Sequence, residues 1–210
     1  DTAEQVRAIG RRAIVVEADV SDRAAVERMF DETEEKLGPC NILVTNAVMS
    51  TRNSLLETKI EDFDRTLKIG VYGVFHCMQS FARRMVAQGR LNGSIVHICS
   101  PHAKGPFKDC IDYNVCKAGS HHLALSAANE LMWQGIRVNM VQPGWTYTAG
   151  EERMYGTKVL DRAASQMPLG RLCNVADVGK AAVWLCSDEA AYVTGACVTV
   201  DGGQFIETAP

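Results

Sequence analysis

Long apolar runs and runs of like charge are both missing from this sequence. No apolar segment approaches the roughly 20 residues that a membrane-spanning helix needs. The formal net charge is -3 and no long basic run occurs, so we expect neither a nucleic-acid partner nor a membrane partner. Apolar residues make up 47% and charged residues 22% of the 210 residues, which predicts one soluble globular domain over 1–210.

Closely spaced cysteine pairs are missing as well. None of the eight cysteines forms a CxxC pair, and several fall inside apolar runs. A structural zinc site needs clustered Cys and His ligands, so we expect no metal site. Scattered free thiols are typical of a reducing compartment, and we expect a cytoplasmic protein.

Short apolar runs, in contrast, recur along the chain and alternate with longer amphipathic stretches. Such runs, bounded by Gly, Pro or Asp, are typical of strands buried on both faces. We expect strands at Ala13–Ala18, Ile42–Thr45, Ser94–Cys99, Ile136–Val141 and Cys197–Val200, helices near 22–37, 60–88, 113–134 and 175–187, and loops at Pro101–Asp112 and Thr146–Met154. The alternation predicts an α/β fold, a parallel sheet with helices on both faces and right-handed crossovers.

Local signals place the first of these helices and one edge of the sheet. Ser21 is an N-cap candidate, with Asp22 in the first turn and Gly38 after the end of the helix.

Ligands of parallel sheets bind at the carboxyl ends of the strands. The polar or turn residues that directly follow the predicted strands are Asp19, Asn46, Ser100 and Pro143-Gly144. We expect these groups, which come from four strands, to converge at one edge.

Tyr113 and Lys117 are spaced four residues apart as a helical pattern begins. Positions i and i+4 are neighbours on one helix face, and a cation close to a phenol lowers its pKa from the usual value near 10. Such a pair is suited to acid/base catalysis. Ser100 ends a predicted strand thirteen residues earlier, where its hydroxyl could bind the same substrate oxygen.

With these residues in place, the sequence resembles the short-chain dehydrogenase/reductase family. The family's active-site motif is matched by Ser100, Tyr113 and Lys117, and its NNAG segment is similar to Thr45-Asn46-Ala47-Val48. The remaining matches are Asp19 followed by Val20, a PGxxxT segment at residues 143–148, and LCSDEAAYVTG followed by VDGG at Val200–Gly203. They stand in family order across nearly the whole chain.

The resemblance implies a role for each matched residue. Tyr113 is implied as the general acid/base, Ser100 as the residue that orients the substrate oxygen, and Lys117 as the lysine that binds the nicotinamide ribose and lowers the tyrosine pKa. The implied NAD or NADP site consists of Asp19, Val20, Asn46, Ala47, Pro143, Gly144, Thr146 and Thr148, together with Tyr113 and Lys117. In such enzymes the dinucleotide supplies the hydride, and the protein supplies position and electrostatics.

The glycine-rich phosphate loop of the family has no counterpart, because Gly10 is the only glycine before the third-strand segment. We therefore expect an N-terminally truncated chain, a Rossmann-like doubly wound domain lacking the first two strands, roughly forty to fifty residues by analogy with the fold. In the family order 3-2-1-4-5-6-7, this leaves Ala13–Ala18 without a neighbour and exposes an edge of Ile42–Thr45. The alternative is a natural chain that has lost dinucleotide binding.

Two further positions depart from the family pattern. Gly70 stands where the family has an asparagine that supports a proton-relay water, and a glycine inside a helix costs about 1 kcal/mol relative to alanine. Val48 stands where NNAG has glycine, and its Cβ is expected to crowd the cofactor's approach. At Gly70, either the relay uses another group or turnover is reduced.

The function that these features favour is an NAD(P)-dependent oxidoreductase that interconverts a secondary alcohol and a ketone. The polar and aromatic residues of 101–112 and 146–160 suit a sugar, a polyol or a similar small hydroxy compound. Two alternatives stay open, a 3-oxoacyl-carrier-protein-type reductase and a non-catalytic relative or fragment that no longer binds cofactor. Family members pair the helices expected at 60–88 and 113–134, which implies a homodimer or homotetramer.

Overall fold

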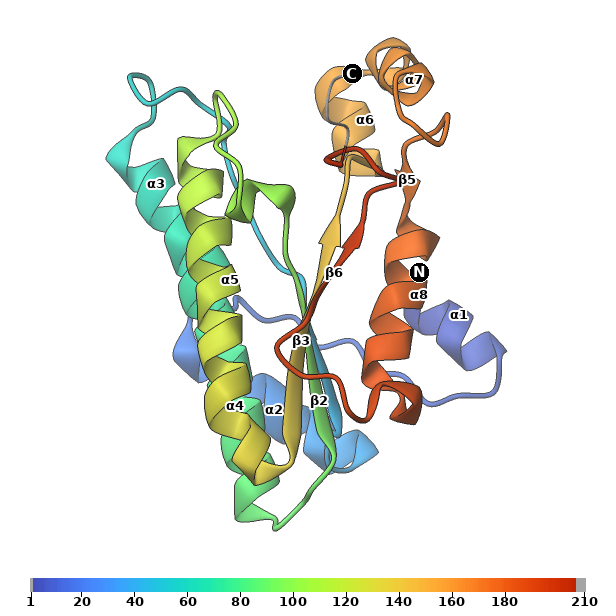
Figure 1. Cartoon of the computed structure of the whole chain (residues 1–210). Coiled ribbons are helices and arrows are strands. Elements are labelled where there is room, and N and C mark those ends of the chain that lie inside the picture. Colours follow the sequence, from blue (N-terminus) through green and yellow to red (C-terminus); the bar gives the residue numbers. More distant parts are fainter. Residues whose placement is uncertain (1, 207–210) are drawn as a thin grey trace.

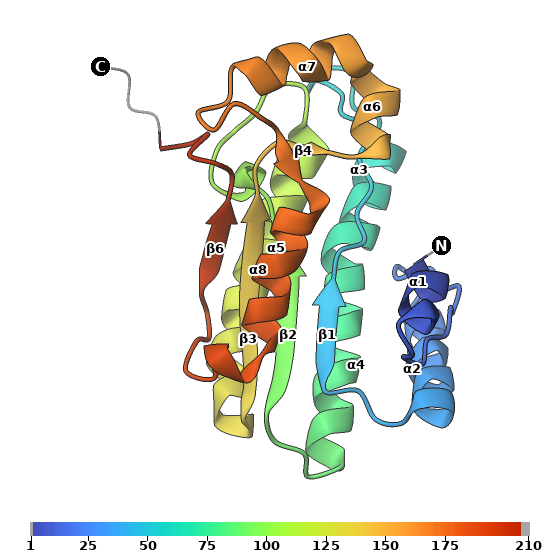
Figure 2. The same ribbon diagram turned by 90° about the vertical axis from the view of Figure 1, so that its right-hand side faces the viewer.

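A four-stranded parallel sheet forms the centre of the molecule. The computed structural model describes residues 2–206, and the strand order is β1-β2-β3-β6. The strands are β1 (Ile42–Thr45), β2 (Gly93–Ile98), β3 (Ile136–Pro143) and β6 (Cys197–Val200). All four arrowheads lie at the same end of the sheet (Figure 2). Asn46, Ser100 and Gly144, which follow β1, β2 and β3, are therefore gathered at one edge, as the sequence predicts.

Helices cover both faces of this sheet. Figure 1 shows α4 and α5 on one face and α8 on the other. The helices are α1 (Thr2–Ala8), α2 (Arg23–Leu37), α3 (Ile60–Leu67), α4 (Gly73–Ala87), α5 (Ile111–Leu131), α6 (Ala149–Tyr155), α7 (Thr157–Ser165) and α8 (Val175–Cys186). This arrangement confirms the Rossmann-like fold class.

Alternation along the strands divides the apolar core into two layers, because successive side chains of a strand point to opposite faces. Ile95 is packed in the larger cluster with Phe81 and Met85 of α4. Its neighbour Val96 belongs to the second cluster, together with Leu185 of α8. All five side chains are at most 1% exposed, so both helical layers are fixed to the sheet by buried apolar contacts.

The segment Ala13–Ala18 is not a strand, and this prediction was wrong. The segment is irregular, and β1 is the edge of the described sheet on that side. A β-branched run becomes a strand only when a neighbouring strand pairs with its N–H and C=O groups. Here the Ala13 carbonyl instead accepts hydrogen bonds from the Arg7 side chain. The predicted exposed edge is present, since Ile42 is 51% exposed.

Asp22, and not Ser21, caps α2. The Asp22 carboxylate accepts the Ala24 backbone N–H at 2.8 Å, while the Ser21 hydroxyl donates to Asp19 at 2.7 Å. A carboxylate at this position also interacts favourably with the helix dipole. Gly38 ends the helix with a positive φ of 93°, as expected for a residue after a helix C-terminus.

The helix predicted over 60–88 is interrupted by a π-helical turn. Residues Lys68–Tyr72 form this turn between α3 and α4. Gly70 lies at its centre and is buried against α5. An interruption of this kind carries one extra residue per turn and is not visible in an apolar pattern alone, which explains the prediction of one continuous helix.

The segment after β3 is more regular than predicted. Residues 146–154, expected to form a loop, contain β4 (Thr146–Tyr147) and most of α6, and β4 pairs with β5 (Cys173–Asn174). The α6–α7 unit lies beyond the carboxyl ends of the strands of the sheet (Figure 2). At the other predicted loop, Pro101–Ala103 is a 3-10 helix and α5 begins at Ile111.

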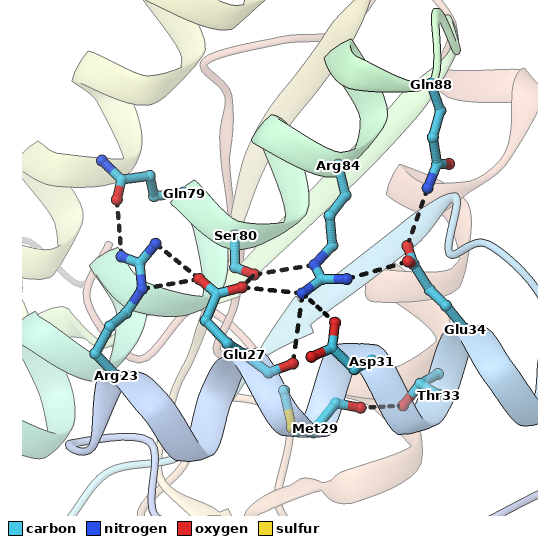
Figure 3. A network of polar contacts seen from close by, with 10 residues as sticks. All are labelled: Arg23, Glu27, Met29, Asp31, Thr33, Glu34, Gln79, Ser80, Arg84 and Gln88. Atoms are coloured by element: carbon cyan, nitrogen blue, oxygen red, sulfur yellow. Dashed lines mark hydrogen bonds and ion pairs between the residues drawn. The ribbon is translucent and has the colours of Figure 1, made fainter.

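A charged network holds α2 against α4 (Figure 3). The Arg84 guanidinium of α4 forms ion pairs with Glu27, Asp31 and Glu34, which follow one face of α2 at helical spacing. Glu27 also accepts a hydrogen bond from Ser80 at 2.8 Å. Because the Arg84 side chain is only 21% exposed, these pairs are partly shielded from solvent.

Among residues 2–206, no helix is long and apolar enough to cross a membrane, and no group of three or more His, Cys, Asp or Glu side chains is arranged to hold a metal ion. All eight cysteines are free, and none is classed as exposed.

Candidate functional site

The three residues expected to carry the chemistry lie together at the carboxyl end of β2. Ser100 follows this strand and is 6% exposed, and Tyr113 is in the first turn of α5. Lys117 follows one turn later, with its ammonium nitrogen 5.6 Å from the centroid of the Tyr113 ring. A hydroxyl, a phenol and an ammonium group from two elements thus face the same edge of the sheet.

Lys117 is almost completely buried, at 3% exposure. Its Nζ donates a hydrogen bond of 2.8 Å to the backbone carbonyl of Ile98. Burial lowers the pKa of Lys117, because a desolvated ammonium is disfavoured. An ammonium has three donors, so donors remain for another ligand after the bond to Ile98.

The pKa of Tyr113 is raised to about 12, mainly by burial. A hydrogen bond with Ser100 and the charge of Arg52 oppose this rise. The direction is opposite to the one that the family resemblance implies for a tyrosine beside Lys117. The physical reason is that desolvation of the phenolate outweighs the hydrogen bond with Ser100 and the charge of Arg52. Tyr113 is therefore held in the protonated form, ready to donate.

A buried carboxylate anchors the start of α5, and the sequence did not single it out. Asp112 is fully buried and accepts hydrogen bonds from Ser50 at 3.0 Å and from Thr66 at 2.7 Å. It also accepts the backbone N–H of Thr51, at 3.4 Å, and that of Tyr113, at 2.8 Å. These bonds fix the loop after β1 and the first turn of α5 relative to each other.

That loop brings a second cation beside the tyrosine. The Arg52 guanidinium carbon is 5.8 Å from the Tyr113 ring centroid, within cation–π range. Arg52 forms an ion pair of 3.0 Å with Glu151 and donates to the Tyr155 hydroxyl at 2.8 Å. Both partners belong to α6, and Glu151 also accepts from the Trp145 indole. The loop after β1 is thereby connected to α6 across the site.

A buried histidine lies behind the lysine. His97 of β2 is 2% exposed and is bonded to Thr45 of β1 at 2.9 Å and to Ser120 of α5 at 3.1 Å. Ser120 in turn donates to the Lys117 carbonyl. Burial lowers the pKa of His97 to about 3, so the ring is neutral. This polar chain ties two strands to the α5 turn that bears Lys117.

The residues expected on the adenosine side lie after Ala13–Ala18 and after β1. Asp19 is exposed, and its pKa is lowered by hydrogen bonds from Ser21. Val20 packs against Gly73 of α4, where a Cβ would approach the Val20 side chain to 2.6 Å. Asn46 and Ala47 are exposed directly after β1. No hydrogen bond within the described residues joins Asp19 to Asn46, so these groups remain accessible to a ligand.

The residues expected on the nicotinamide side follow β3. Gly144 packs so tightly against β6 that a Cβ would lie 2.8 Å from Asp201, which explains the glycine after Pro143. The Thr146 hydroxyl donates to the Gly144 carbonyl at 2.9 Å. Thr148 caps α6, and its hydroxyl accepts the Glu151 N–H at 3.1 Å. Both threonine hydroxyls therefore have structural partners in this segment.

The two departures from the family pattern meet in space. A Cβ added to Gly70 would overlap Cys116 Sγ and lie 3.4 Å from Val48 Cγ2. The Cys116 thiol and the Val48 side chain thus occupy the room beside the glycine. Cys116 precedes Lys117, so this contact lies next to the buried ammonium.

Comparison with known proteins gives a consistent result. The family model described as Enoyl-(Acyl carrier protein) reductase matches residues 1–204. The chain is 34% identical to an L-rhamnose 1-dehydrogenase (NAD(P)(+)) of Sphingomonas sp. (strain SKA58), over 96% of this chain and 80% of the relative. It is 32% identical to the short-chain dehydrogenase/reductase eriH of Hericium erinaceus, over 98% of this chain and 81% of the relative.

Among solved structures, a gluconate 5-dehydrogenase from Burkholderia cenocepacia J2315, in complex with NADP and tartrate, superposes with a TM-score of 0.89. The two chains are 28% identical, and the match covers 99% of this chain and 81% of the other. The matched family model, these relatives and the geometry of the site agree, and the chain belongs to the short-chain dehydrogenase/reductase family of oxidoreductases.

Proposed function

We propose that this protein uses NAD or NADP to interconvert a secondary alcohol and a ketone in a sugar, a polyol or a similar small hydroxy compound. The observation that carries this proposal is the convergence of Ser100, Tyr113 and Lys117 at the carboxyl end of β2. The names of the rhamnose and gluconate dehydrogenases among its relatives support the substrate class.

The site residues divide the work of the reaction. In the reductive direction, Tyr113 gives its phenolic proton to the substrate oxygen, and Ser100 donates a hydrogen bond that orients this oxygen. In the oxidative direction, Tyr113 must first release its own proton, and the phenolate then takes the hydroxyl proton. The buried Lys117 supplies positive charge beside the phenol and N–H donors for a ribose. When bound, NAD or NADP supplies or accepts the hydride.

The described residues fit such a cofactor at both ends. Lys117 keeps unused donors, and Gly144 follows the central strand in close contact with β6. The exposed Asp19 carboxylate and the exposed Asn46-Ala47 pair offer contacts for the adenosine half. We expect calorimetric titration of this chain to show weak binding of NADH or NADPH at most, and oxidation of a panel of aldoses and alditols to produce NADH or NADPH absorbance.

Two alternatives lead to different outcomes of these experiments. The description of the matched family model favours an acyl-carrier substrate, and a 3-oxoacyl-carrier-protein-type reductase would reduce a 3-ketoester faster than any sugar is oxidised. The Val48 and Cys116 side chains beside Gly70 favour a relative without catalysis, which would bind neither NADH nor NADPH. Cofactor-linked turnover of a sugar or polyol would exclude both.

We also propose a cytoplasmic homodimer or homotetramer. A groove between α4 and α5 is lined by apolar side chains, including Phe75, Val86, Leu123 and Leu131. Phe75 is 42% and Val86 48% exposed in the single chain. Size-exclusion chromatography with light scattering is expected to show a dimer or tetramer, and Val86→Glu is expected to weaken it. A monomer at all concentrations would contradict this proposal.

A further inference from the structure

The His102 ring lies against the proposed acid/base residue. His102 is in the 3-10 helix after Ser100, and its backbone N–H donates to the Ser100 hydroxyl oxygen at 3.3 Å. Its ring meets the Tyr113 ring edge to face, with centroids 4.9 Å apart and an interplanar angle of 81°. The His102 ring also stacks on the Phe107 ring, with centroids 4.1 Å apart. The imidazole is therefore fixed beside the two residues that hold the reacting oxygen.

Asn114 determines which ring nitrogen of His102 carries the proton. The Asn114 amide nitrogen donates to the Phe107 carbonyl at 2.8 Å, and its amide oxygen lies 2.7 Å from His102 Nδ1. The reversed amide would bring two acceptor oxygens together at Phe107, which is unfavourable. The Asn114 oxygen is therefore an acceptor, so Nδ1 must be protonated. In the neutral ring, Nε2 then carries a lone pair.

Neutrality of the ring follows from its surroundings. Burial lowers the pKa of His102, an effect that the hydrogen bond to Asn114 opposes only in part. The nearby cations Arg52 and Lys117 lower it further. At neutral pH the ring is thus an imidazole with one donor and one acceptor.

The acceptor nitrogen is available to a ligand. No hydrogen bond to His102 Nε2 is formed within residues 2–206. All buried side-chain nitrogen and oxygen atoms of those residues have partners, so Nε2 is accessible from outside. On the same tyrosine, Arg52 presents a cation with five N–H donors, of which two are used by Tyr155 and Glu151. An accessible acceptor and accessible donors thus adjoin Tyr113.

We propose that His102 is a specificity-determining residue whose Nε2 accepts a hydrogen bond from a hydroxyl group on the substrate carbon next to the reacting carbon. This inference rests on the proposed function and narrows it to vicinal diols and the corresponding α-hydroxy ketones. A plain secondary alcohol, or a 3-ketoester with a methylene group at that carbon, leaves Nε2 without this partner. Sites that bind a hydroxyl reject analogues that lack it, because a polar group of the protein is left unpaired.

A matched pair of alcohols tests the proposal. Vicinal cyclohexanediol and cyclohexanol differ by one hydroxyl on the carbon next to the carbinol. We expect the wild-type protein to prefer the diol by about 10- to 100-fold in kcat/KM, because solvent can partly replace the lost partner at an accessible nitrogen. His102→Phe keeps the aromatic contacts and removes the acceptor, so the ratio is expected to fall to about 1.

His122→Phe is the matched control, because His122 is exposed on the same helix as Tyr113 and away from these contacts. It is expected to keep the wild-type ratio. Unchanged discrimination in His102→Phe would overturn the inference. A wild-type protein that oxidises neither alcohol nor any aldose or alditol with NAD or NADP would instead contradict the proposed function.

A spectroscopic measurement tests the same inference without turnover. Two-bond ¹H–¹⁵N correlation spectra distinguish the two neutral tautomers of a histidine, and His102→Phe assigns the resonance. We expect the Nδ1–H tautomer and a shift of the Nε2 resonance on addition of vicinal cyclohexanediol but not of cyclohexanol. The Nε2–H tautomer, or equal responses to both alcohols, would overturn the proposal.

Discussion

The α2–α4 interface and the site at the start of α5 both contain networks of polar side chains, but they treat charge differently. In the interface, the Arg84 guanidinium forms ion pairs with three carboxylates, so a charge is paired with groups of opposite charge (Figure 3). In the site, the Lys117 ammonium donates a hydrogen bond to a neutral carbonyl, and burial keeps His97 uncharged. Ion pairs between opposite charges stabilise the fold. Titratable groups that are hydrogen-bonded only to neutral groups have protonation states that a ligand can change.

Tyr113→Phe should separate the two regions most clearly. Loss of the phenolic proton is expected to reduce kcat by about 10²- to 10⁴-fold, the usual contribution of general acid/base catalysis. The melting temperature should change little, because the ring contacts with His102 and Arg52 remain. Steady-state kinetics and thermal unfolding measure the two effects. Tyr147→Phe is the control, since Tyr147 is 41% exposed, and normal turnover by Tyr113→Phe would refute its assigned role.

Arg84→Met should have the reverse effect, on stability and not on chemistry. Removing the guanidinium leaves three neighbouring carboxylates without their shared partner, and we expect a loss of about 2 kcal/mol in the free energy of unfolding. The partial exposure of Arg84 keeps this below the loss from a fully buried pair. Urea unfolding measures the loss. Arg83→Met, at an exposed position of the same helix, should be near neutral, and equal losses in both variants would remove the special role of Arg84.

Gly70→Ala tests whether packing at the site is as tight as the contacts indicate. The new Cβ would overlap Cys116 Sγ, so we expect a loss of about 1–2 kcal/mol in the free energy of unfolding. Cys116→Ala removes the sulfur and leaves the Cβ of residue 116 at 3.9 Å from the new Cβ. This second change should restore much of the loss in the double variant. A double-mutant cycle by urea unfolding measures the coupling. Additive losses would show that the two positions do not share this space.

The neutral state of His97 should appear as a pH dependence of stability. With a folded pKa of about 3 and an unfolded value of 6.5, the unfolded chain binds more protons between these two pH values. This contribution to stability is complete above pH 6.5 and declines as the pH falls, by at most about 1.4 kcal/mol per pH unit. His97→Gln should flatten that part of the profile, and His122→Gln should not. Identical slopes in wild type and His97→Gln would exclude the histidine as the cause.

The sequence predicted those features that local spacing determines. The β-branched runs that became β1, β2, β3 and β6 carry their own signal, and so does the four-residue spacing of Tyr113 and Lys117. Ala13–Ala18 has a similar composition and is not a strand, because a strand also requires a partner.

The contacts of the site were harder to predict, because their partners are distant along the chain. Asp112 bonds to Thr66, and Arg52 pairs with Glu151 99 residues away. No periodicity connects such residues, so only the folded structure places them together. Of the residues that the sequence did not single out, His102 was the easiest to predict, because it lies two positions after Ser100.

The π-helical turn at Lys68–Tyr72 has a consequence for insertions and deletions. Each residue of an α-helix turns the chain by about 100°, so the extra residue of the π turn changes the angular phase between α3 and α4. Deleting one residue there would allow a continuous α-helix, but would rotate Thr66 away from Asp112 while Phe81 stays in the core. The length of this turn thus sets the alignment of the site relative to the core.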